Sequence, residues 1–428
     1  MGVKQHIYIV FFLSFFIFLE SFAQIDNRFR FQSNMYQKND INSEYHIVFL
    51  LPLCLEHNNV LYSNDIDSLA NMNLEGIHLY KKTKISIDFY LGFLSSLKEF
   101  QNTKIKISLF DIKEGYESKD ILIDILNQNY LNHADLIIGP LFTDNFLFFK
   151  DILDRNIPII SPFSKKPYIT QGNENVFQLP PSMSNHLSFL SEYIFDTHMN
   201  DNLLLIRRDT IFTTRKNNTD TAEDYALITD TLVPEDIFYS QKILSNIDTM
   251  SMFFEEIKVH ANIIDSIHHK LDTLGMKNII IIPSEDNVFV TDLLSKLHAC
   301  RDTNMIVYGM PGLSNFYHVS IYDLMDMKVT FPQNKSFDTN ATEEFIINFY
   351  SDYSYIPNLK YASVGYELGY YFLDILFDNG SIMPYVNDVP PKTILGTTYH
   401  FKKERNGGYQ NKATLLFQYH DFGFRVMK

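Results

Sequence analysis

Cysteine is scarce in this chain of 428 residues, which contains only Cys54 and Cys300. The two positions are far apart, and a sequence does not supply the short Cα separation that a disulfide demands. We expect two separate buried thiols, with a single bridge as the alternative. Two cysteines on their own do not build a structural zinc site. The sequence therefore predicts neither a bound metal nor a cofactor.

Basic residues are outnumbered, with 36 Lys and Arg against 51 Asp and Glu and a net charge of −15. A protein that binds nucleic acid along its phosphates needs clustered Lys and Arg, so the composition argues against that class. Glycine and proline are also few, at 16 and 15, while 46% of the residues are hydrophobic. These values exclude collagen-like and disordered chains. The length predicts two or three packed domains.

Long apolar runs are missing except at residues 7–19. This run follows Lys4 and precedes Ser21-Phe22-Ala23, which is the layout of a secretory signal peptide at residues 1–23. As a helix the run covers about 20 Å, short of a bilayer core of about 30 Å. No cysteine beside Ala23 offers a lipid anchor. The sequence thus predicts an exported, periplasmic protein that is soluble after signal cleavage, without stable membrane insertion, and that begins with a flexible leader at residues 24–44.

Hydrophobic periodicity indicates an α/β fold. Short, fully apolar runs are typical of buried parallel strands, and segments with helical spacing lie between them. In the first block we expect strands at residues 45–52, 104–111, 134–139 and 157–161 and helices at residues 85–100, 118–131 and 143–156. This alternation predicts a parallel sheet built from right-handed βαβ units. Residues 55–83 form an expected insertion between the first strand and its helix.

A second block repeats the pattern after residue 182. We expect helices at residues 185–198, 288–299, 342–355 and 361–378 and strands at residues 202–207, 279–283 and 304–308. The polar residues 209–249 predict a surface excursion around one strand at residues 225–229. Beyond residue 392 the chain has short strands and a turn at Gly407-Gly408. We expect those strands to close the edges of the sheets.

The common catalytic motifs do not occur. Both phosphate-binding glycine motifs are missing, as is the G-x-S-x-G elbow of hydrolases. No H-E-x-x-H accompanies His260, His268 and His269, which we expect to be solvent-exposed. Carboxylates at strand or helix ends serve either as general acid and base or as helix-start residues; they are Asp111, Asp135, Asp144, Glu285 and Asp286. Without an activated nucleophile, the sequence predicts a protein that is not an enzyme.

Three strand-to-helix loops carry small or hydroxylic residues that suit a ligand. In an open parallel sheet, ligands bind at the carboxyl ends of the strands, where helix N-termini present unpaired N–H groups. Thr143, Ser161 and Ser164 can donate to a carboxylate there, helped by the helix dipole and by Lys165 or Lys166. Helix capping explains each hydroxyl equally well. The loops are residues 139–143, 161–167 and 308–312.

A resemblance to a known family is carried by IIGPLFTDNFLFFKDILDRNIPIISPFSKKPYITQGNENVFQLPPS, residues 137–182. This segment is similar to the first-domain core of type I periplasmic binding proteins, the branched-chain amino-acid-binding family whose fold is shared by receptor ligand-binding regions. Further support comes from DFYLGFLSSL at Asp88, from IIIIPSEDNVFVTDLL followed by IVYGMPGL, and from YASVGYELGYYFLDIL at Tyr361. The resemblance covers most of residues 45–428.

The resemblance implies an α/β fold of two lobes, each a parallel sheet flanked by helices. The first lobe would comprise residues 45–180 and 331–415, and the second residues 181–330 and 416–428. Three hinge crossings would join them, near residues 179–184, 327–332 and 414–420. Closure of the lobes around a ligand would be the mechanism.

The resemblance also implies a binding site. Thr143 matches the family's hydroxyl after the Gly-Pro loop, and Ser164 with Lys165 matches the positions that hold a ligand's carboxylate. The family's acidic partner for a ligand ammonium falls closest to Pro311, which cannot ionise. Because a desolvated ammonium needs a charge partner, this departure disfavours an amino-acid ligand. The expected ligand-binding residues are Tyr90, Leu141, Phe142, Thr143, Ser161, Ser164, Lys165, Glu285, Tyr308 and Met310.

Two functions follow as expectations. The first is an exported solute-binding protein that closes on a small polar ligand for uptake or sensing, with a membrane permease of the ABC transporter class as partner. The second is a cell-envelope interaction protein, such as a regulator of peptidoglycan synthesis, that keeps the fold without a solute and acts on a cell-wall synthase. The hydroxylic loops favour the first function, whereas Pro311 and Lys165 favour the second.

Overall fold

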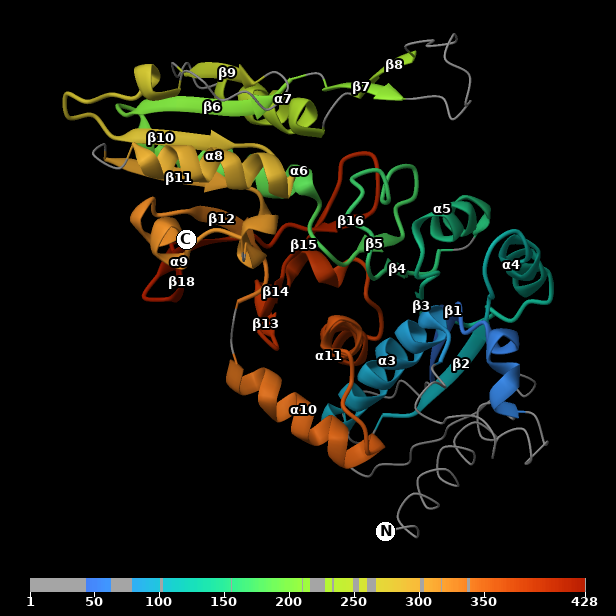
Figure 1. Ribbon diagram of the computed structural model, residues 1–428. Coiled ribbons are helices and arrows are strands. Elements are labelled where there is room, and N and C mark those ends of the chain that lie inside the picture. Colours follow the sequence, from blue (N-terminus) through green and yellow to red (C-terminus); the bar gives the residue numbers. More distant parts are fainter. Residues whose placement is uncertain are drawn as a thin grey trace, which may run out of the picture. The chain divides into compact units, whose positions relative to one another are not determined.

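The computed structural model describes residues 44–62, 79–100, 103–154, 156–209, 211–215, 228–232, 235–248, 254–259, 267–300, 304–316, 318–336 and 339–427 (Figure 1). The predicted signal peptide, and the predicted leader up to residue 43, lie outside these residues. The chain divides into two units, which are described separately. Unit 1 is Met1–Ser182 with Asp338–Ala413, and unit 2 is Met183–Phe337 with Thr414–Lys428. The chain therefore passes between the units three times.

Unit 1 is built on a sheet of seven strands in the order β15-β16-β5-β4-β3-β1-β2. All neighbours pair in parallel except β15, which runs antiparallel to β16 at the edge. Every residue of β1 is buried, as expected for a central strand covered on both faces. The strands are β1 Tyr45–Leu51, β2 Ile105–Asp111, β3 Leu136–Ile138, β4 Ile159–Ser161, β5 Val176–Gln178, β15 Phe401–Lys403 and β16 Tyr409–Asn411, and a separate hairpin holds β13 Lys392–Ile394 and β14 Thr397–Tyr399.

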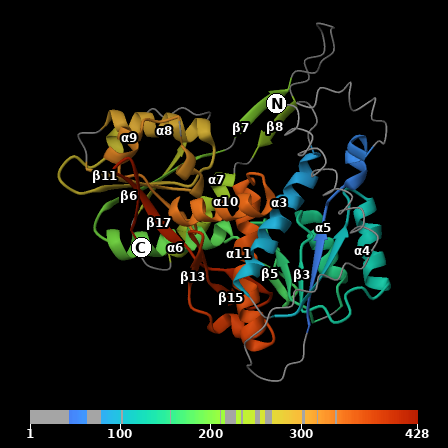
Figure 2. The ribbon, with the colours of Figure 1, turned by 90° about the horizontal axis from the view of Figure 1, so that it is seen from below.

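Helices cover both faces of this sheet. On one face, α3 and α11 lie side by side (Figures 1 and 2), and their apolar side chains meet Ile47, Phe49 and Leu51 of β1. On the other face, α4 and α5 pack against Val48 and Leu50. Alternate residues of one strand thus serve two cores. The helices are α3 Lys81–Ser96, α4 Glu117–Asn127, α5 Thr143–Ile152, α10 Thr339–Tyr353 and α11 Leu359–Asn379, with 3-10 turns η1 Leu55–Tyr62, η3 Leu97–Glu99 and η6 Tyr385–Asp388.

Unit 2 repeats this design with the strand order β18-β17-β12-β11-β10-β6-β9. The strands from β12 to β9 pair in parallel, and β17 and β18 extend the sheet in antiparallel pairing. The strands are β6 Asn202–Arg208, β9 Glu255–Val259, β10 Asn278–Ile282, β11 Met305–Gly309, β12 Thr330–Gln333, β17 Leu415–His420 and β18 Gly423–Val426. In a separate two-stranded sheet, β7 Ile211–Arg215 pairs with β8 Ile228–Leu232 in antiparallel orientation.

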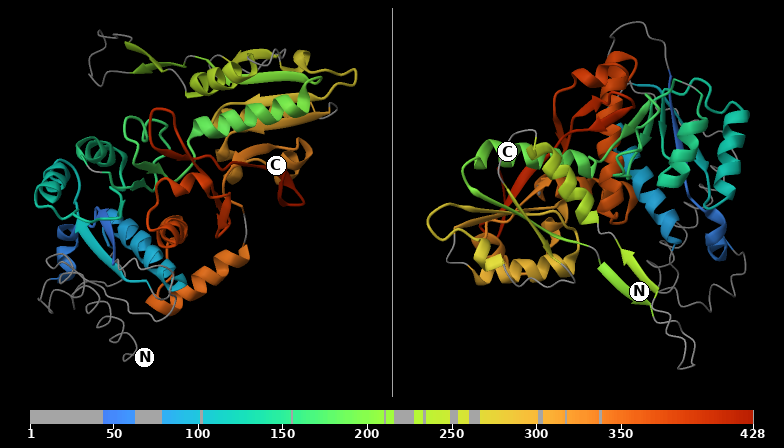
Figure 3. Two further views of the ribbon diagram at one scale, coloured as in Figure 1. Left: turned by 180° about the vertical axis from the view of Figure 1, so that it is seen from behind. Right: turned by 90° about the horizontal axis from the view of Figure 1, so that it is seen from above.

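The helices of unit 2 also lie on both faces of its sheet, with α6 and α8 on opposite sides in Figure 3. One core forms between the sheet and α6 and α7, and a second beneath α8 and α9. The helices are α6 Met183–His198, α7 Glu235–Asp248, α8 Asn287–Ala299 and α9 Ile321–Asp326, with 3-10 turns η4 Ile267–Lys270 and η5 Pro311–Asn315. Within the described ranges, none of the helices has both the length and the apolar character needed to cross a bilayer.

The predicted α/β architecture is confirmed, including the short strands that close both sheets at their edges. The expectation of a mere surface excursion at residues 209–249 is wrong, because α7 lies there and buries Tyr239 and Ile243 against the sheet. Part of the predicted strand at residues 225–229 falls outside the described residues. His260 also lies outside them, whereas His268 and His269 are exposed in η4, as expected.

The two cysteines are thiols and do not form a disulfide. Cys54 is buried, as expected, whereas Cys300 at the end of α8 is only half-buried. Burial raises the pKa of both thiols.

Candidate ligand-binding site

The predicted hydroxyls of unit 1 gather where β3 and β4 end. Ser161 is the last residue of β4 and is buried, and Thr143 is the first residue of α5. Thr143 Oγ1 donates to Ser164 Oγ across 3.1 Å. The residue before α5, Phe142, has no side chain that caps the helix. The first turn of α5 therefore offers backbone N–H groups and a pair of hydroxyls in one place.

The loop that carries Ser164 is held in position by a residue that the sequence analysis did not identify. Gln178, at the end of β5, is fully buried, and its Nε2 donates to the carbonyl oxygens of Ser164 and Lys166 at 2.9 Å each. The side chain of Lys165 projects to solvent from this loop. In the sequence, a glutamine directly after an apolar strand residue hints at such a role, but its hydrogen-bond partners can be identified only from the fold.

Aromatic and aliphatic residues of the predicted site pack into unit 1 itself. Leu141 is buried in the core, and the ring of Tyr90 lies edge-on to Phe49 with centroids 5.1 Å apart. Burial raises the pKa of the Tyr90 hydroxyl. Phe163, in the Ser161 loop, is half-buried between Phe89 and Tyr361 at 5.3 and 5.7 Å. Leu141 and Tyr90 therefore belong to the core packing of unit 1.

A cluster of charged and polar side chains borders Phe142. The ammonium of Lys82 lies over the Phe142 ring, 5.1 Å from its centroid, and forms an ion pair with Glu114. Tyr80 donates from its hydroxyl to Glu114 Oε1 at 2.9 Å. The hydrogen bonds from Lys82 and Tyr80 lower the pKa of Glu114, which is therefore ionised at neutral pH. Cys54 and His57 complete a group that can hold a metal ion with Glu114.

In unit 2, two of the three predicted residues belong to the core. Met310 and Tyr308 are buried beneath α6, and the Tyr308 hydroxyl lies 2.8 Å from Nε2 of the buried His198. Burial raises the pKa of Tyr308. Glu285 is exposed, and its Oε1 lies 3.7 Å from the point that a Cβ on Gly312 would occupy. Of the three predicted residues in unit 2, Glu285 is thus the one that presents a polar group to solvent.

A cluster of charged side chains around Arg208, at the carboxyl end of β6, was not predicted from the sequence. Arg208 donates through Nε and Nη2 to both oxygens of Asp236, at 2.8 and 2.9 Å, and its Nη1 lies 2.9 Å from Asp286 Oδ2. Asp286 also accepts from the Phe289 N–H at the start of α8. Asp286 is therefore a helix-start residue, one of the two roles predicted for it. An arginine at a strand end was the visible signal.

Two further carboxylates from the sequence analysis serve the backbone. Asp111, at the end of β2, accepts from the N–H groups of Cys54, Leu55 and Lys113. Asp135 accepts from the His46 N–H at 2.7 Å, and burial raises its pKa. Both side chains fix loops, which is a structural use of a carboxylate.

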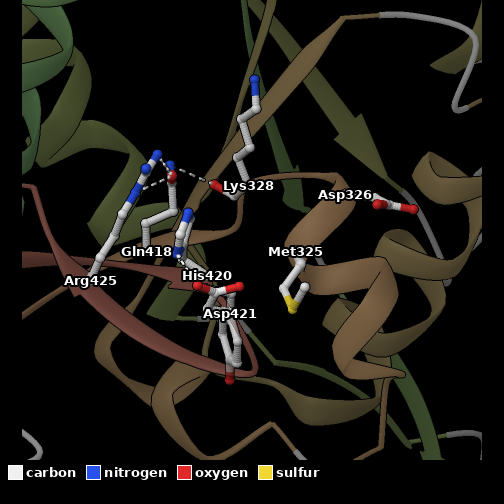
Figure 4. Close-up of a pocket in the computed structure, with 8 residues that line it drawn as sticks. Met325, Asp326, Lys328, Gln418, His420, Asp421 and Arg425 are labelled. Atoms are coloured by element: carbon white, nitrogen blue, oxygen red, sulfur yellow. Dashed lines mark hydrogen bonds and ion pairs between the residues drawn. The ribbon is translucent and has the colours of Figure 1, made fainter.

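Two hollows lie elsewhere in the described residues and share no residue with the predicted set. In unit 2, a hollow of about 360 Å³ is bordered by Met325, Asp326, Lys328 and the β17–β18 hairpin. Figure 4 shows Arg425 and Gln418 turned toward one another at its rim, where Arg425 Nη2 donates to Gln418 Oε1 at 2.6 Å. In unit 1, a hollow of about 450 Å³ lies among α3, α10 and α11.

Comparisons with known proteins were made for the sequence and for the fold. No family model matches the chain. It is 30% identical over 110 residues to the GTPase Der of Karelsulcia muelleri (strain GWSS), and the match spans 25% of this chain and 25% of that protein. The phosphate-binding glycine motif of nucleotide-binding sites does not occur in this chain. The chain thus spans about a quarter of the curated relative that it matches.

The solved structures give a likeness over nearly the whole chain. A putative branched-chain amino acid ABC transporter protein from Rhodospirillum rubrum has a TM-score of 0.57 at 11% identity, over 90% of this chain and 100% of that one. A branched chain amino acid ABC transporter periplasmic ligand-binding protein from Burkholderia xenovorans LB400 has a TM-score of 0.52 at 10% identity, over 90% and 94%. Full-length LpoA from Haemophilus influenzae has a TM-score of 0.54 at 11% identity, over 93% of this chain and 60% of that one.

The two sheets, their order and these likenesses define the class: the chain has the two-lobed α/β fold of type I periplasmic binding proteins. The expected fold is thereby confirmed. The structures named above include a periplasmic ligand-binding protein of an ABC transporter and LpoA.

Proposed function

We propose that the protein is an exported solute-binding protein, whose two lobes close on a small polar ligand for uptake or sensing. The observation that supports this most directly is the pairing of Thr143 Oγ1 with Ser164 Oγ at the uncapped start of α5. Hydroxyls and N–H groups at a helix N-terminus suit a carboxylate or another anionic group.

The residues of the proposed site contribute to ligand binding in different ways. Hydrogen bonds to a charged group contribute about 1.5–3 kcal/mol each, and the hydroxyls of Thr143 and Ser164 can each turn from one another to the ligand. Lys165 is exposed on the same loop and supplies a screened positive charge. Gln178 contributes indirectly, because it fixes the Ser164 loop before any ligand arrives.

A second candidate is an envelope protein that has the fold but binds a partner protein, such as a cell-wall synthase, instead of a solute. It is favoured by the burial of Tyr308 and Met310 in the core of unit 2, which leaves Glu285 as the polar group of that set open to solvent. The likeness to LpoA, with a TM-score of 0.54, is compatible with it.

The test is a thermal-shift screen of the mature chain, Gln24–Lys428, against amino acids, short peptides, sugars, nucleosides and muropeptides. A ligand at 100 times its dissociation constant stabilises the protein by about 2.7 kcal/mol, which raises the melting temperature by a few degrees. Thr143→Ala with Ser164→Ala should abolish that shift.

The matched control is Thr291→Ala with Ser295→Ala, because these hydroxyls lie on the solvent side of α8 and donate to their own helix. This control should keep the full shift. Silence across the library, together with capture of a membrane-bound cell-wall synthase by the same chain, would establish the second candidate instead.

A further inference from the structure

Three side chains of the kinds that bind transition metals meet beside β1 and β2. Cys54 and His57 follow β1, and Glu114 follows β2; one ligand atom of each lies within 4.8 Å of the others. Because β1 and β2 are parallel neighbours, their carboxyl ends bring these loops together. We propose that this group binds a divalent transition-metal ion of the zinc type through Cys54 Sγ, a ring nitrogen of His57 and a carboxylate oxygen of Glu114.

The set of donor atoms selects the class of ion. A thiolate with an imidazole and one carboxylate suits zinc and its neighbours, whereas calcium and magnesium require oxygen ligands throughout. Three protein ligands are one short of the four of a structural zinc site. The fourth position is therefore filled by water or by an oxygen of a bound solute.

The exposure of the three residues defines the route of the ion. Cys54 is fully buried, while the side chains of His57 and Glu114 are 40% and 28% exposed. The His57 Nδ1 atom lies 3.8 Å from Glu114 Oε1, so a small contraction brings both atoms to one ion. The thiol forms the base of the site, and the ion enters between the imidazole and the carboxylate.

The backbone around Cys54 is held in an uncommon conformation. Its φ is +49°, which is rare for a residue with a Cβ atom. Asp111 holds it there by accepting from the N–H groups of Cys54 and Leu55 at 3.0 and 3.2 Å. The amide of Asn58 donates to the Cys54 carbonyl at 3.2 Å and to Thr83 Oγ1 at 3.0 Å, which fastens this loop to α3. The position of the thiol is thus fixed before an ion arrives.

Tyr80 orients the other two ligands. Its hydroxyl donates to Glu114 Oε1, and its ring lies edge-on to the His57 ring with centroids 4.6 Å apart. Hydrogen bonds from neighbouring groups to metal ligands typically change metal affinity by about 10- to 100-fold. Tyr80 therefore acts as a positioning residue for the carboxylate and the imidazole.

Lys82 is the cation that balances Glu114 in the absence of an ion, through its ion pair with Oε2. A metal ion on the same carboxylate is repelled by that ammonium and must share the carboxylate or displace the lysine. Removing the positive charge should consequently tighten metal binding. This expectation separates a specific site from loose binding elsewhere on an acidic protein.

Metal binding at Cys54 must also release a proton. Burial, with the carboxylates of Asp111, Glu114 and Glu56, raises the pKa of Cys54 to about 12, against the opposing effect of Lys82. The reaction is Cys–SH plus M²⁺ giving Cys–S–M⁺ plus H⁺, so one proton is released for each ion that is bound. The titratable and charged groups around the thiol are Glu56, His57, Tyr80, Lys82, Asp111 and Glu114.

The test is a titration of the full chain with Co²⁺ under reducing conditions, without any solute. We expect a thiolate-to-cobalt charge-transfer band and the intense visible absorption of a tetrahedral site, both reversed by Zn²⁺. Cys54→Ser should remove the charge-transfer band. Cys300→Ser is the matched control, because this other thiol is half-buried and lies in unit 2, and the band should persist.

Three further measurements keep the proposal falsifiable if Cys54→Ser fails to fold. His57→Ala changes a partly exposed side chain and should weaken Co²⁺ binding by more than the roughly 10- to 100-fold that loss of a neighbouring group costs, because it removes a ligand. Lys82→Met should tighten it by about tenfold, and a pH-stat should record one proton released per ion at neutral pH.

The proposal is overturned if the wild-type chain gives no charge-transfer band, or if the band survives Cys54→Ser or disappears in Cys300→Ser. Unchanged affinity in Lys82→Met would likewise overturn it. Because no solute is present, a failure here is distinguishable from a failure of the solute-binding proposal.

Discussion

The crossing of α3 and α11 is held together by glycines, and we predict that a single methyl group there destabilises unit 1. A Cβ added at Gly365 would lie 2.0 Å from the carbonyl oxygen of Phe89, and one added at Gly92 would lie 2.0 Å from that of Ala362. Ordinary contact begins at 3.4 Å. The obstacle in both cases is backbone, which cannot rotate away, so the helices must separate by more than 1 Å.

The magnitude for Gly365→Ala follows from two opposing effects. Overpacking of a dense core costs up to about 3 kcal/mol, and a gap of 0.5–1 Å already removes about a quarter to a half of each contact's attraction. Alanine in a helix interior is favoured over glycine by about 1 kcal/mol. The free energy of unfolding of unit 1 should therefore fall by up to about 2 kcal/mol.

The assay is urea unfolding, followed for Gly365→Ala and for a graded pair of controls. Gly369→Ala meets the side chain of Ser96 at 2.0 Å, which is able to rotate, and should cost less. Gly423→Ala in β18 meets nothing closer than 3.9 Å and should leave the unfolding midpoint unchanged or slightly raised. Equal unfolding midpoints for Gly365→Ala and wild type would refute the reasoning, because they would show that the two helices can move apart without a loss of stability.

Three further changes test groups described above. Burial raises the pKa of the Asp88 carboxyl, which accepts a hydrogen bond from the Tyr355 hydroxyl. Protonation of Asp88 therefore contributes fully to the free energy of unfolding below the ordinary pKa of about 3.9, and this contribution is lost as the pH rises through the higher pKa of the folded state. Asp88→Asn should make urea unfolding less dependent on pH and should stabilise the protein most at neutral pH. Tyr308→Phe leaves the ring of buried His198 without its hydroxyl partner and should cost about 1–3 kcal/mol in the same assay. Asp286→Ala removes the cap of α8 and should cost about 1 kcal/mol, whereas Asp286→Asn should retain most of the stability.

Strongly apolar segments could be predicted from sequence because burial on both faces leaves little choice of residue. The strand that became β10 and the long helix that became α11 are examples, and both were predicted within three residues of their observed ends. Helix α7 was missed for the opposite reason. Its buried side includes Asp236 and Ser240 beside Tyr239 and Ile243, and Asp236 is buried because Arg208 pairs with it. A prediction from the spacing of apolar residues cannot detect a helix face that is buried through an ion pair.

The candidate sites show the same division. Thr143 and Ser164 could be nominated because hydroxyls near a helix start have a known use, and the structure brings their oxygen atoms together. The metal-binding group was not nominated, although His57 follows Cys54 at a spacing of three, because Glu114 comes from the next strand. Such a group depends on the pairing of β1 with β2 rather than on any local pattern. The ligand-binding residues themselves stay predictions until the screen is made.

The order of strands in both sheets has a consequence for the newly made polypeptide. In unit 1, β16 pairs with β5, and α11 contributes buried side chains to the core that it shares with α3, yet both are synthesised after the whole of α6 to β12. In unit 2, β17 must pair with β12. The sheet of unit 1 is complete only with β16, which ends at Asn411, and the sheet of unit 2 only with β17 and β18, which end at Val426. Neither unit can therefore complete its sheet before the chain has been made beyond residue 410. Until then each unit keeps an open sheet edge, whose unpaired backbone groups can pair with another chain.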